Sequence, residues 1–305
     1  MKRIGIIVNL NSRKYKLAKK PDDSYERLGG DHVIVRYTHS IDEIADVATE
    51  FKRAGMDYIA PCGGDGTLHH VITQFNKIYQ NNLPPFLILK GGTMNNVATS
   101  INLKGDAESI LKRAIETIKA DNALPSIKRK TMSINNTYCF LFGNGLVADF
   151  LERYYTIGKS YTKLVKLIYN SIVEALFNKN SNFFKGFDGS ITCDRQTLPY
   201  ANVLGLLAGT VETVGMGFYP LYRANEKNDS FHVIVCAMAP KDLAKNIVKL
   251  KKGTPIRHEK FYENTVKTIE IHSDKPFAYT MDGDLYYAED TLKVTTGINV
   301  HFVVV

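Results

Sequence analysis

The first 125 residues alternate between short apolar runs and longer segments with helical spacing. The apolar runs at 4–8, 33–37, 58–61 and 86–90 have the length and composition of buried strands. Strands that alternate with helices are typical of parallel α/β architecture, because a parallel strand needs a long crossover connection. We therefore expect a parallel sheet covered by helices in this part of the chain.

The segment 40–55, SIDEIADVATEFKRAG, carries signals for both ends of a helix. Ser40 is expected to be the N-cap, and Glu43, three residues later, completes a capping box. Gly55 stands where a helix commonly ends in a left-handed residue. Two further helices are expected, from about residue 67 to 79 and over 106–120.

Beyond residue 126 the pattern changes to short β-type runs separated by turn signals. This texture predicts a mostly antiparallel second domain. We place the domains at 1–125 and 126–305, and expect that the last strand can pack back on the first domain.

Two helical segments interrupt this second half, at about 150–177 and at 240–252. We expect their apolar residues in the core and their lysines in solvent, and contact with anionic lipids is the alternative. The first segment has an apolar stripe formed by Tyr161, Val165, Ile168, Ile172 and Leu176. The second has a lysine face formed by Lys241, Lys245, Lys249 and Lys252.

Composition narrows the class of protein. The 305 residues carry a formal charge of +8, which favours anionic partners, and no aromatic-studded basic motif supports nucleic acid among them. No stretch reaches the ~18 apolar residues of a membrane span, and the N-terminal apolar run is too short for a signal peptide. The four cysteines lack CxxC spacing, which favours a reducing cytoplasm over a disulfide framework or a zinc site.

Two glycine-rich loops follow predicted strands, CGGDGT at 62–67 and KGGTMNN at 90–96. A strand, a glycine turn and a helix start together form an anion-binding device, because bare backbone approaches phosphate oxygens closely. In an open parallel sheet such loops lie at the carboxyl edge, where ligands bind. Neither loop has the GxGxxG or GxxxxGK[ST] spacing of the common nucleotide motifs.

A carboxylate, Asp65, lies inside the first glycine loop. Beside a polyphosphate it would be repelled unless a divalent cation bridges the two, which implies Mg²⁺. The alternative is that Asp65 caps and holds the turn. A second acidic turn, MDGD at 281–284, lies between two β-type runs, where Asp282 is either a catalytic base or part of an ordinary hairpin turn. Taken alone, the residues favour the hairpin.

These segments resemble, in order, the motifs of the diacylglycerol kinase catalytic-domain superfamily. That superfamily includes soluble bacterial lipid kinases, sphingosine and ceramide kinases and, more distantly, NAD kinases. GGDGT resembles its signature, IVNLNSRK at 7–14 its first-strand motif, and GGTMNNVA at 91–98 its G-T-x-N-D-F-A motif. Later, 215–231 resembles its glycine-rich run ending in Asn-Asp-Gly-Leu, and TMDGDLY at 280–286 its D-G-E motif.

The resemblance implies an α/β nucleotide domain, a β-sandwich-like second domain and a set of residue roles. Asp282 would be the general base, and Asp65 would support the metal–nucleotide complex. The resemblance places ATP at Asn9, Ser12, Thr38, Gly63, Gly64, Asp65, Gly66, Thr67, Thr93 and Asn95, and Mg²⁺ at Asp229, Phe231 and Glu226.

We accordingly expect a cytoplasmic, Mg²⁺- and ATP-dependent lipid kinase of phospholipid biosynthesis, peripheral to the inner face of the membrane. Its acceptor would be an alcohol group of a diacylglycerol-like lipid. A kinase of a soluble acceptor, as NAD kinases are, is one alternative, and a non-catalytic nucleotide- or lipid-binding regulator is another. His69 and His70 stand where the family often has an acid, which keeps the regulator open. A homodimer is also left open.

Overall fold

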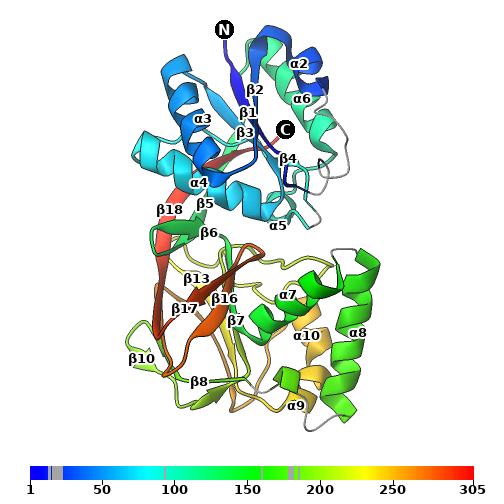
Figure 1. Ribbon diagram of the computed structural model, residues 1–305, viewed down its shortest axis with the longest axis vertical. Helices are drawn as coiled ribbons and strands as arrows, with labels where there is room; N and C mark the ends of the chain where they lie inside the picture. The colour runs from blue at the N-terminus through cyan, green and yellow to red at the C-terminus, as the bar shows by residue number, and fades with distance from the viewer. Residues whose placement is uncertain (13–14, 16–22, 93, 159–160, 178–181, 185) are drawn as a thin grey trace. The chain divides into compact units, whose positions relative to one another are not determined.

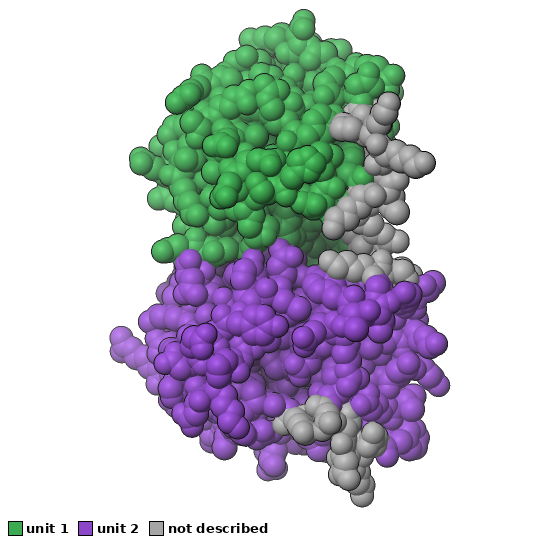
Figure 2. Space-filling view, in the orientation of Figure 1, with its two compact units in different colours: residues 1–131, 136–138, 298–305 green, residues 132–135, 139–297 purple. Residues whose placement is uncertain are grey.

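The structure is a computed structural model that describes residues 1–12, 15, 23–92, 94–158, 161–177, 182–184 and 186–305. These residues form two compact units. Unit 1 comprises 1–131, 136–138 and 298–305, and unit 2 comprises 132–135 and 139–297 (Figure 2). The expected fold class is confirmed, because unit 1 holds a parallel sheet with helices and unit 2 is built mostly of antiparallel sheets.

Unit 1 is built on a four-stranded parallel sheet of order β2-β1-β3-β4. Helices α3 and α4 pack together, and α2 packs with α6 (Figure 1). The elements of the sheet and its helices are β1 (Ile4–Asn9), α2 (Ser24–Gly29), η1 (Gly30–His32), β2 (Val33–Thr38), α3 (Ile41–Ala54), β3 (Tyr58–Gly63), α4 (Asp65–Tyr79), β4 (Leu89–Lys90), α5 (Asn96–Ser100) and α6 (Ala107–Lys119).

The predicted capping of α3 is confirmed. The Glu43 amide donates to Ser40 Oγ at 3.2 Å, and Gly55 ends the helix in the left-handed region with φ of 64°. Glu43 Oε2 in turn accepts from the amide of His39 at 2.7 Å. The helix therefore begins and ends where its local sequence chemistry requires.

Three strands carry residues of both units: β5 (Ser126–Ile134), β6 (Thr137–Cys139) and β18 (Thr291–Val303). In unit 1 the end of β18 lies beside Phe86, whose amide donates to the His301 carbonyl at 2.8 Å. The Val303 amide returns a bond of 2.8 Å to the Phe86 carbonyl. The C-terminal strand therefore extends the edge of the unit 1 sheet.

Unit 2 contains an antiparallel sheet of order β14-β13-β12-β7-β16-β17 and strands of a second sheet, β10-β9-β15-β18-β5-β6. Side chains of both sheets share one buried cluster, which includes Phe142, Val233 and Ile271. The strands are β7 (Leu141–Gly145), β8 (Phe187–Asp188), β9 (Ser190–Cys193), β10 (Gln196–Thr197), β11 (Asn202–Val203), β12 (Gly205–Gly209), β13 (Phe231–Cys236), β14 (Phe261–Val266), β15 (Thr268–His272), β16 (Phe277–Met281) and β17 (Asp284–Ala288).

The helices of unit 2 are shorter than the sequence pattern predicts. One helix over about 150–177 is wrong, because Gly158, with φ of 93°, separates two helices. One helix over 240–252 is also wrong, because Asn246 lies between two short helices. The elements are α7 (Leu146–Ile157), α8 (Tyr161–Phe177), η2 (Asn182–Phe184), α9 (Pro240–Lys245) and α10 (Ile247–Lys252).

A second buried cluster lies on the other face of the β14-β13-β12-β7-β16-β17 sheet, around Leu204, Leu221 and Ile234. Leu146 of α7, Leu243 of α9 and Leu250 of α10 pack against it. Strand β13 is consequently buried along its whole length, with one face on each cluster.

Candidate functional site

The carboxyl ends of the unit 1 strands lie at one edge of the sheet, because the strands run parallel. Strand β1 ends at Asn9, which pairs in register with Thr38 at the end of β2. Strand β3 ends at Gly63, which pairs with Lys90 at the end of β4. The residues that the sequence places after these strands are therefore brought to one edge, as expected for a ligand site in an open sheet.

Polar side chains at this edge are tied to one another. Asn9 Nδ2 donates to Thr67 Oγ1 at 2.8 Å, while Asn9 Oδ1 accepts from the Asn11 amide at 2.8 Å. The Ser12 amide donates to the Asn9 carbonyl at 3.0 Å. Ser12 Oγ is buried and has no hydrogen-bond partner among the described residues. Thr38 is buried, at 2% exposed, and its hydroxyl donates to the Val8 carbonyl at 3.5 Å.

The two glycine loops touch each other through their backbones. The Gly91 amide donates to the Gly63 carbonyl at 2.8 Å. A Cβ added to Gly92 would lie 2.4 Å from the Gly64 Cα, closer than side-chain carbons approach backbone. Glycine is required at this contact because no side chain fits between the loops. Gly64, Gly91 and Gly92 are partly exposed, so the two loops present bare backbone beside the first turn of α4.

Asp65 joins the two loops from the first turn of α4. Its Oδ2 accepts from the Asn96 amide at 2.8 Å and its Oδ1 from the Val97 amide at 3.1 Å. These are the first amides of α5, which a helix leaves without internal partners. Burial raises the pKa of Asp65 above its ordinary value, and the bonds from Asn96 and Val97 offset part of this rise. In this geometry Asp65 caps a helix 31 residues further along the chain.

Asn95 fixes the conformation of the second loop. It has a φ of 50°, in the left-handed region that asparagine tolerates. Its Nδ2 donates to the Gly92 carbonyl at 3.0 Å, and its Oδ1 accepts from the Gly92 amide at 3.2 Å. Asn95 thus bonds both backbone polar groups of Gly92. Thr93, the other predicted contact of this loop, lies outside the described residues.

In unit 2, Asp282 lies in the two-residue turn between β16 and β17, where Met281 pairs with Asp284. Asp282 and Gly283 have φ of 48° and 92°, as a type I′ hairpin turn requires at both central residues. Asp282 is nevertheless 8% exposed, so its side chain is turned into the protein. The turn is both an ordinary Asp-Gly hairpin and the site of a buried carboxylate.

The Asp282 carboxylate is oriented by backbone amides at the start of β7. Phe140 N lies 3.0 Å from Oδ2 and 3.2 Å from Oδ1, and Leu141 N donates to Oδ1 at 2.9 Å. Tyr155 of α7 donates its hydroxyl proton to the Gly283 carbonyl, and burial raises its pKa to about 12. Burial and the Asp282 charge raise the pKa of the Cys139 thiol, which keeps this thiol protonated.

The predicted metal ligands lie in unit 2, near the start of β13. Arg223 Nε donates to Glu226 Oε2 at 2.5 Å, and this bond lowers the pKa of Glu226. Lys267 pairs with Asp229 and lowers the pKa of that carboxyl. The backbone of Phe231 pairs with β14 in register with Val266. Each carboxylate is thus paired with a cation in this structure, and a metal ion would compete with that pairing.

His232, next to Phe231, is a buried titratable residue that the sequence analysis did not single out. It is 0% exposed, and burial lowers its pKa to about 4. Its Nδ1 accepts from the Arg223 amide at 3.4 Å, and its Nε2 lies 3.9 Å from Glu263 Oε1. The imidazole is therefore neutral over the physiological pH range.

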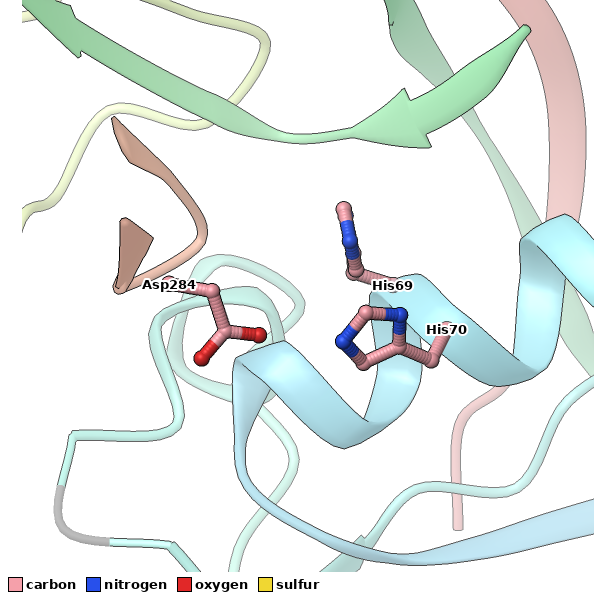
Figure 3. A group of neighbouring side chains, drawn as sticks. All are labelled: His69, His70 and Asp284. Atoms are coloured by element: carbon pink, nitrogen blue, oxygen red, sulfur yellow. The ribbon is translucent and has the colours of Figure 1, made fainter. Parts of the chain in front are cut away.

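The histidine pair of unit 1 lies on α4, within the two turns that follow the first glycine loop (Figure 3). The two rings meet edge to face, with centroids 4.4 Å apart. His69 is 0% exposed, whereas His70 is partly buried. Figure 3 also draws Asp284, which begins β17 in unit 2. His69 consequently contributes to the packing of the α4 face.

Sequence reasoning missed the groups that hold the two acids in place. The amides of Asn96 and Val97 for Asp65, and those of Phe140 and Leu141 for Asp282, carry no side-chain signal. For Asp65, the sequence offered only the alternative that this residue caps and holds the turn. For Asp282, no spacing rule connects a turn to amides more than 140 residues earlier.

Comparison with known proteins agrees with the resemblance. Residues 3–124 match the family model of the diacylglycerol kinase catalytic domain. A probable lipid kinase YegS-like protein of Cronobacter sakazakii is 31% identical over 106 residues, which cover 35% of this chain and 36% of that protein. The probable lipid kinase YegS of Escherichia fergusonii is 29% identical over 106 residues, with the same coverage of 35% and 36%. The matched segment thus spans about a third of the curated relatives' length.

The fold extends further than the sequence match. The crystal structure of a diacylglycerol kinase from Bacillus anthracis superposes with a TM-score of 0.66 at 14% identity, covering 100% of this chain and 97% of that chain. A second structure from the same organism reaches a TM-score of 0.73 at 16% identity, with the same coverage. At this identity the likeness shows that both units share the fold of those proteins.

Proposed function

We propose that the chain is an ATP-dependent lipid kinase, since its residues 3–124 match the family model of the diacylglycerol kinase catalytic domain. The reaction would transfer the γ-phosphoryl group of ATP to the hydroxyl of a diacylglycerol-like lipid. The observation that carries the proposal is the meeting of two glycine loops at the carboxyl edge of a parallel sheet. That arrangement suits the phosphates of a nucleotide.

The residues at this edge fit a nucleotide. Backbone at Gly64 and Gly92 is bare and closely apposed, so phosphate oxygens can approach the loops without meeting a Cβ. The buried Ser12 hydroxyl has no partner among the described residues, which leaves it available to a ligand. Asn9 and Thr67 are already joined at 2.8 Å and present a fixed polar pair.

The acidic residues that were expected near Mg²⁺ already have other partners in this structure. Both oxygens of Asp65 accept backbone amides, and Glu226 and Asp229 are paired with cations. Binding of Mg²⁺ at Asp229, Glu226 and the Phe231 backbone therefore stays a prediction. Within the proposed reaction Asp65 is a positioning residue that fixes the second glycine loop.

Asp282 is the proposed base. The lipid hydroxyl would give its proton to the Asp282 carboxylate as its oxygen bonds the γ-phosphorus, while the bond from that phosphorus to the bridging oxygen breaks and ADP leaves. The amides of Phe140 and Leu141 hold this carboxylate in one orientation, which a base needs. Phosphoryl transfer otherwise asks a protein mainly to position groups and to stabilise charge.

The test is transfer of labelled γ-phosphate from ATP in mixed micelles, with and without divalent cations. The acceptors are diacylglycerol, other lipid alcohols and, as a soluble acceptor, NAD. Label in a lipid is the expected result. Label in NAD alone would contradict the lipid acceptor, and nucleotide binding without any labelled product would contradict an enzyme.

A further inference from the structure

Helix α8 of unit 2 presents large apolar side chains to solvent. Val165, Tyr169 and Phe177 are 44%, 66% and 81% exposed. Val173 and Leu176 continue the same face, since residues three and four apart are neighbours on a helix. The inner face, with Leu164 and Leu167, is buried. A helix that is apolar on both faces has a second surface to cover.

The charges around this exposed face have one sign. Lys163 and Lys166 are the exposed charged residues among the described side chains of α8. Its acid, Glu174, is partly buried and accepts from Arg153 at 3.1 Å, so its charge is compensated. The face is therefore apolar and cationic, without an uncompensated carboxylate among its described residues.

The neighbouring helices α9 and α10 also expose lysines and an apolar side chain. Helix α9 packs against α8, and α10 follows it directly along the chain (Figure 1). Lys241, Lys245 and Lys249 of these helices are exposed, and Val248 is 56% exposed. The single acid of the pair of helices, Asp242, is bonded by Lys245 at 3.0 Å. No described helix of the chain is long and apolar enough to cross a bilayer.

We propose that the outer face of α8, formed by Val165, Tyr169, Val173, Leu176 and Phe177, docks on the surface of an anionic lipid bilayer. An apolar stripe bordered by lysines is the pattern that inserts at the headgroup level, with cations on anionic phosphates. The inference rests on the proposed lipid kinase function, because an acceptor that resides in a bilayer has to be met there. Two residues of this face, Val165 and Leu176, belong to the apolar stripe that the sequence pattern placed in the core.

The test is sedimentation of the full chain with vesicles of phosphatidylcholine, with and without phosphatidylglycerol. Binding is expected to need the anionic lipid and to weaken as salt rises. The double variant Tyr169→Asp, Val173→Asp is expected to partition at least about tenfold less. Its control is Tyr287→Asp, because Tyr287 of β17 is also an exposed tyrosine, at 70%. Lys166→Glu is compared in the same way with Lys112→Glu, an exposed lysine of α6.

Equal binding of the α8 variant and the native chain would overturn the proposal, as would absence of binding to anionic vesicles. If the chain forms a dimer in solution and the α8 variant is monomeric, a second copy covers this face, and the docking proposal is also overturned. Kinase activity is read separately, on a short-chain diacylglycerol below its micelle concentration. Activity there with failed vesicle binding refutes docking alone, whereas variant-sensitive binding without any activity refutes the kinase proposal alone.

Discussion

Replacing Asp65 with alanine tests whether this residue holds the two glycine loops together. The substitution removes the acceptors of the Asn96 and Val97 amides, which lie at 2.8 and 3.1 Å. Hydrogen bonds to a charged group contribute about 1.5–3 kcal/mol each. Because the side chain is only partly buried, we take the lower end, which gives about 3 kcal/mol for the pair.

The assay is amide hydrogen exchange over the α5 segment, measured without nucleotide or metal. A loss of about 3 kcal/mol would raise the opening equilibrium, and with it the exchange rate, about a hundredfold. Asp65→Asn is expected to lie between, because the amide keeps one acceptor oxygen but turns an N–H₂ group towards the second amide. Asp106→Ala is the matched control, since Asp106 caps α6 through the Ser109 amide at 2.8 Å.

The control should cost about 1 kcal/mol, as an ordinary N-cap does, and should leave exchange in α5 unchanged. If Asp65 acted only through a metal ion, its replacement would leave apo exchange unaltered and would weaken only metal-dependent nucleotide binding. Unchanged exchange of α5 in Asp65→Ala would therefore refute the capping argument.

Three further predictions concern other described residues. The folded pKa of His232, about 4, lies below its ordinary value of 6.5, so the stability it contributes is complete above pH 6.5 and is lost, by about 3 kcal/mol, as pH falls through 4. Urea unfolding from pH 7 to 4 should show this slope, and His232→Gln should flatten it; equal slopes would contradict the assignment. Gly92→Ala sets a methyl against Gly64 and should reduce both stability, by about 1–3 kcal/mol, and ATP affinity; a variant that is native in both measurements would contradict the cradle. If Asp229 holds Mg²⁺, Asp229→Asn should raise the cation concentration for half-maximal turnover about tenfold, and Lys267→Met should lower it. Removal of the cation with EDTA sets the baseline, and two unshifted titrations would remove Asp229 from the metal site.

The parts of the fold that depend on local chemistry could be predicted from the sequence. The helix α3 has its cap, its capping box and its terminal glycine within 16 residues, so the sequence determines both ends. The break at Gly158 is also local, but a single glycine inside a long apolar pattern is tolerated often enough that it did not mark a boundary. The expectation that the apolar residues of α8 lie in the core was wrong for Val165 and Leu176, which are exposed, and the reason is different. Helical spacing tells which residues share a face, but the tertiary contacts decide which face is covered.

The candidate site shows where local reasoning ends. The Asp-Gly signal correctly indicates the hairpin at Asp282, and the glycine spacing correctly indicates two backbone loops. Each carboxylate is oriented by backbone amides of a distant segment, Asp65 by those of α5 and Asp282 by those at the start of β7. The sequence left two alternatives open for Asp282, a catalytic base and an ordinary hairpin turn. The structure shows the hairpin turn with its carboxylate buried, and the role as base stays a prediction.

The central claim is that the chain transfers phosphate with Asp282 as base, and the most direct measurement separates turnover from nucleotide binding in Asp282→Asn. The proposal predicts a loss of turnover of about 10²–10⁴-fold, the usual contribution of general base catalysis. It also predicts an ATP dissociation constant within about twofold of native, because the glycine loops of unit 1 are untouched. Native turnover in Asp282→Asn, or an equal loss of turnover and ATP affinity, would contradict the account.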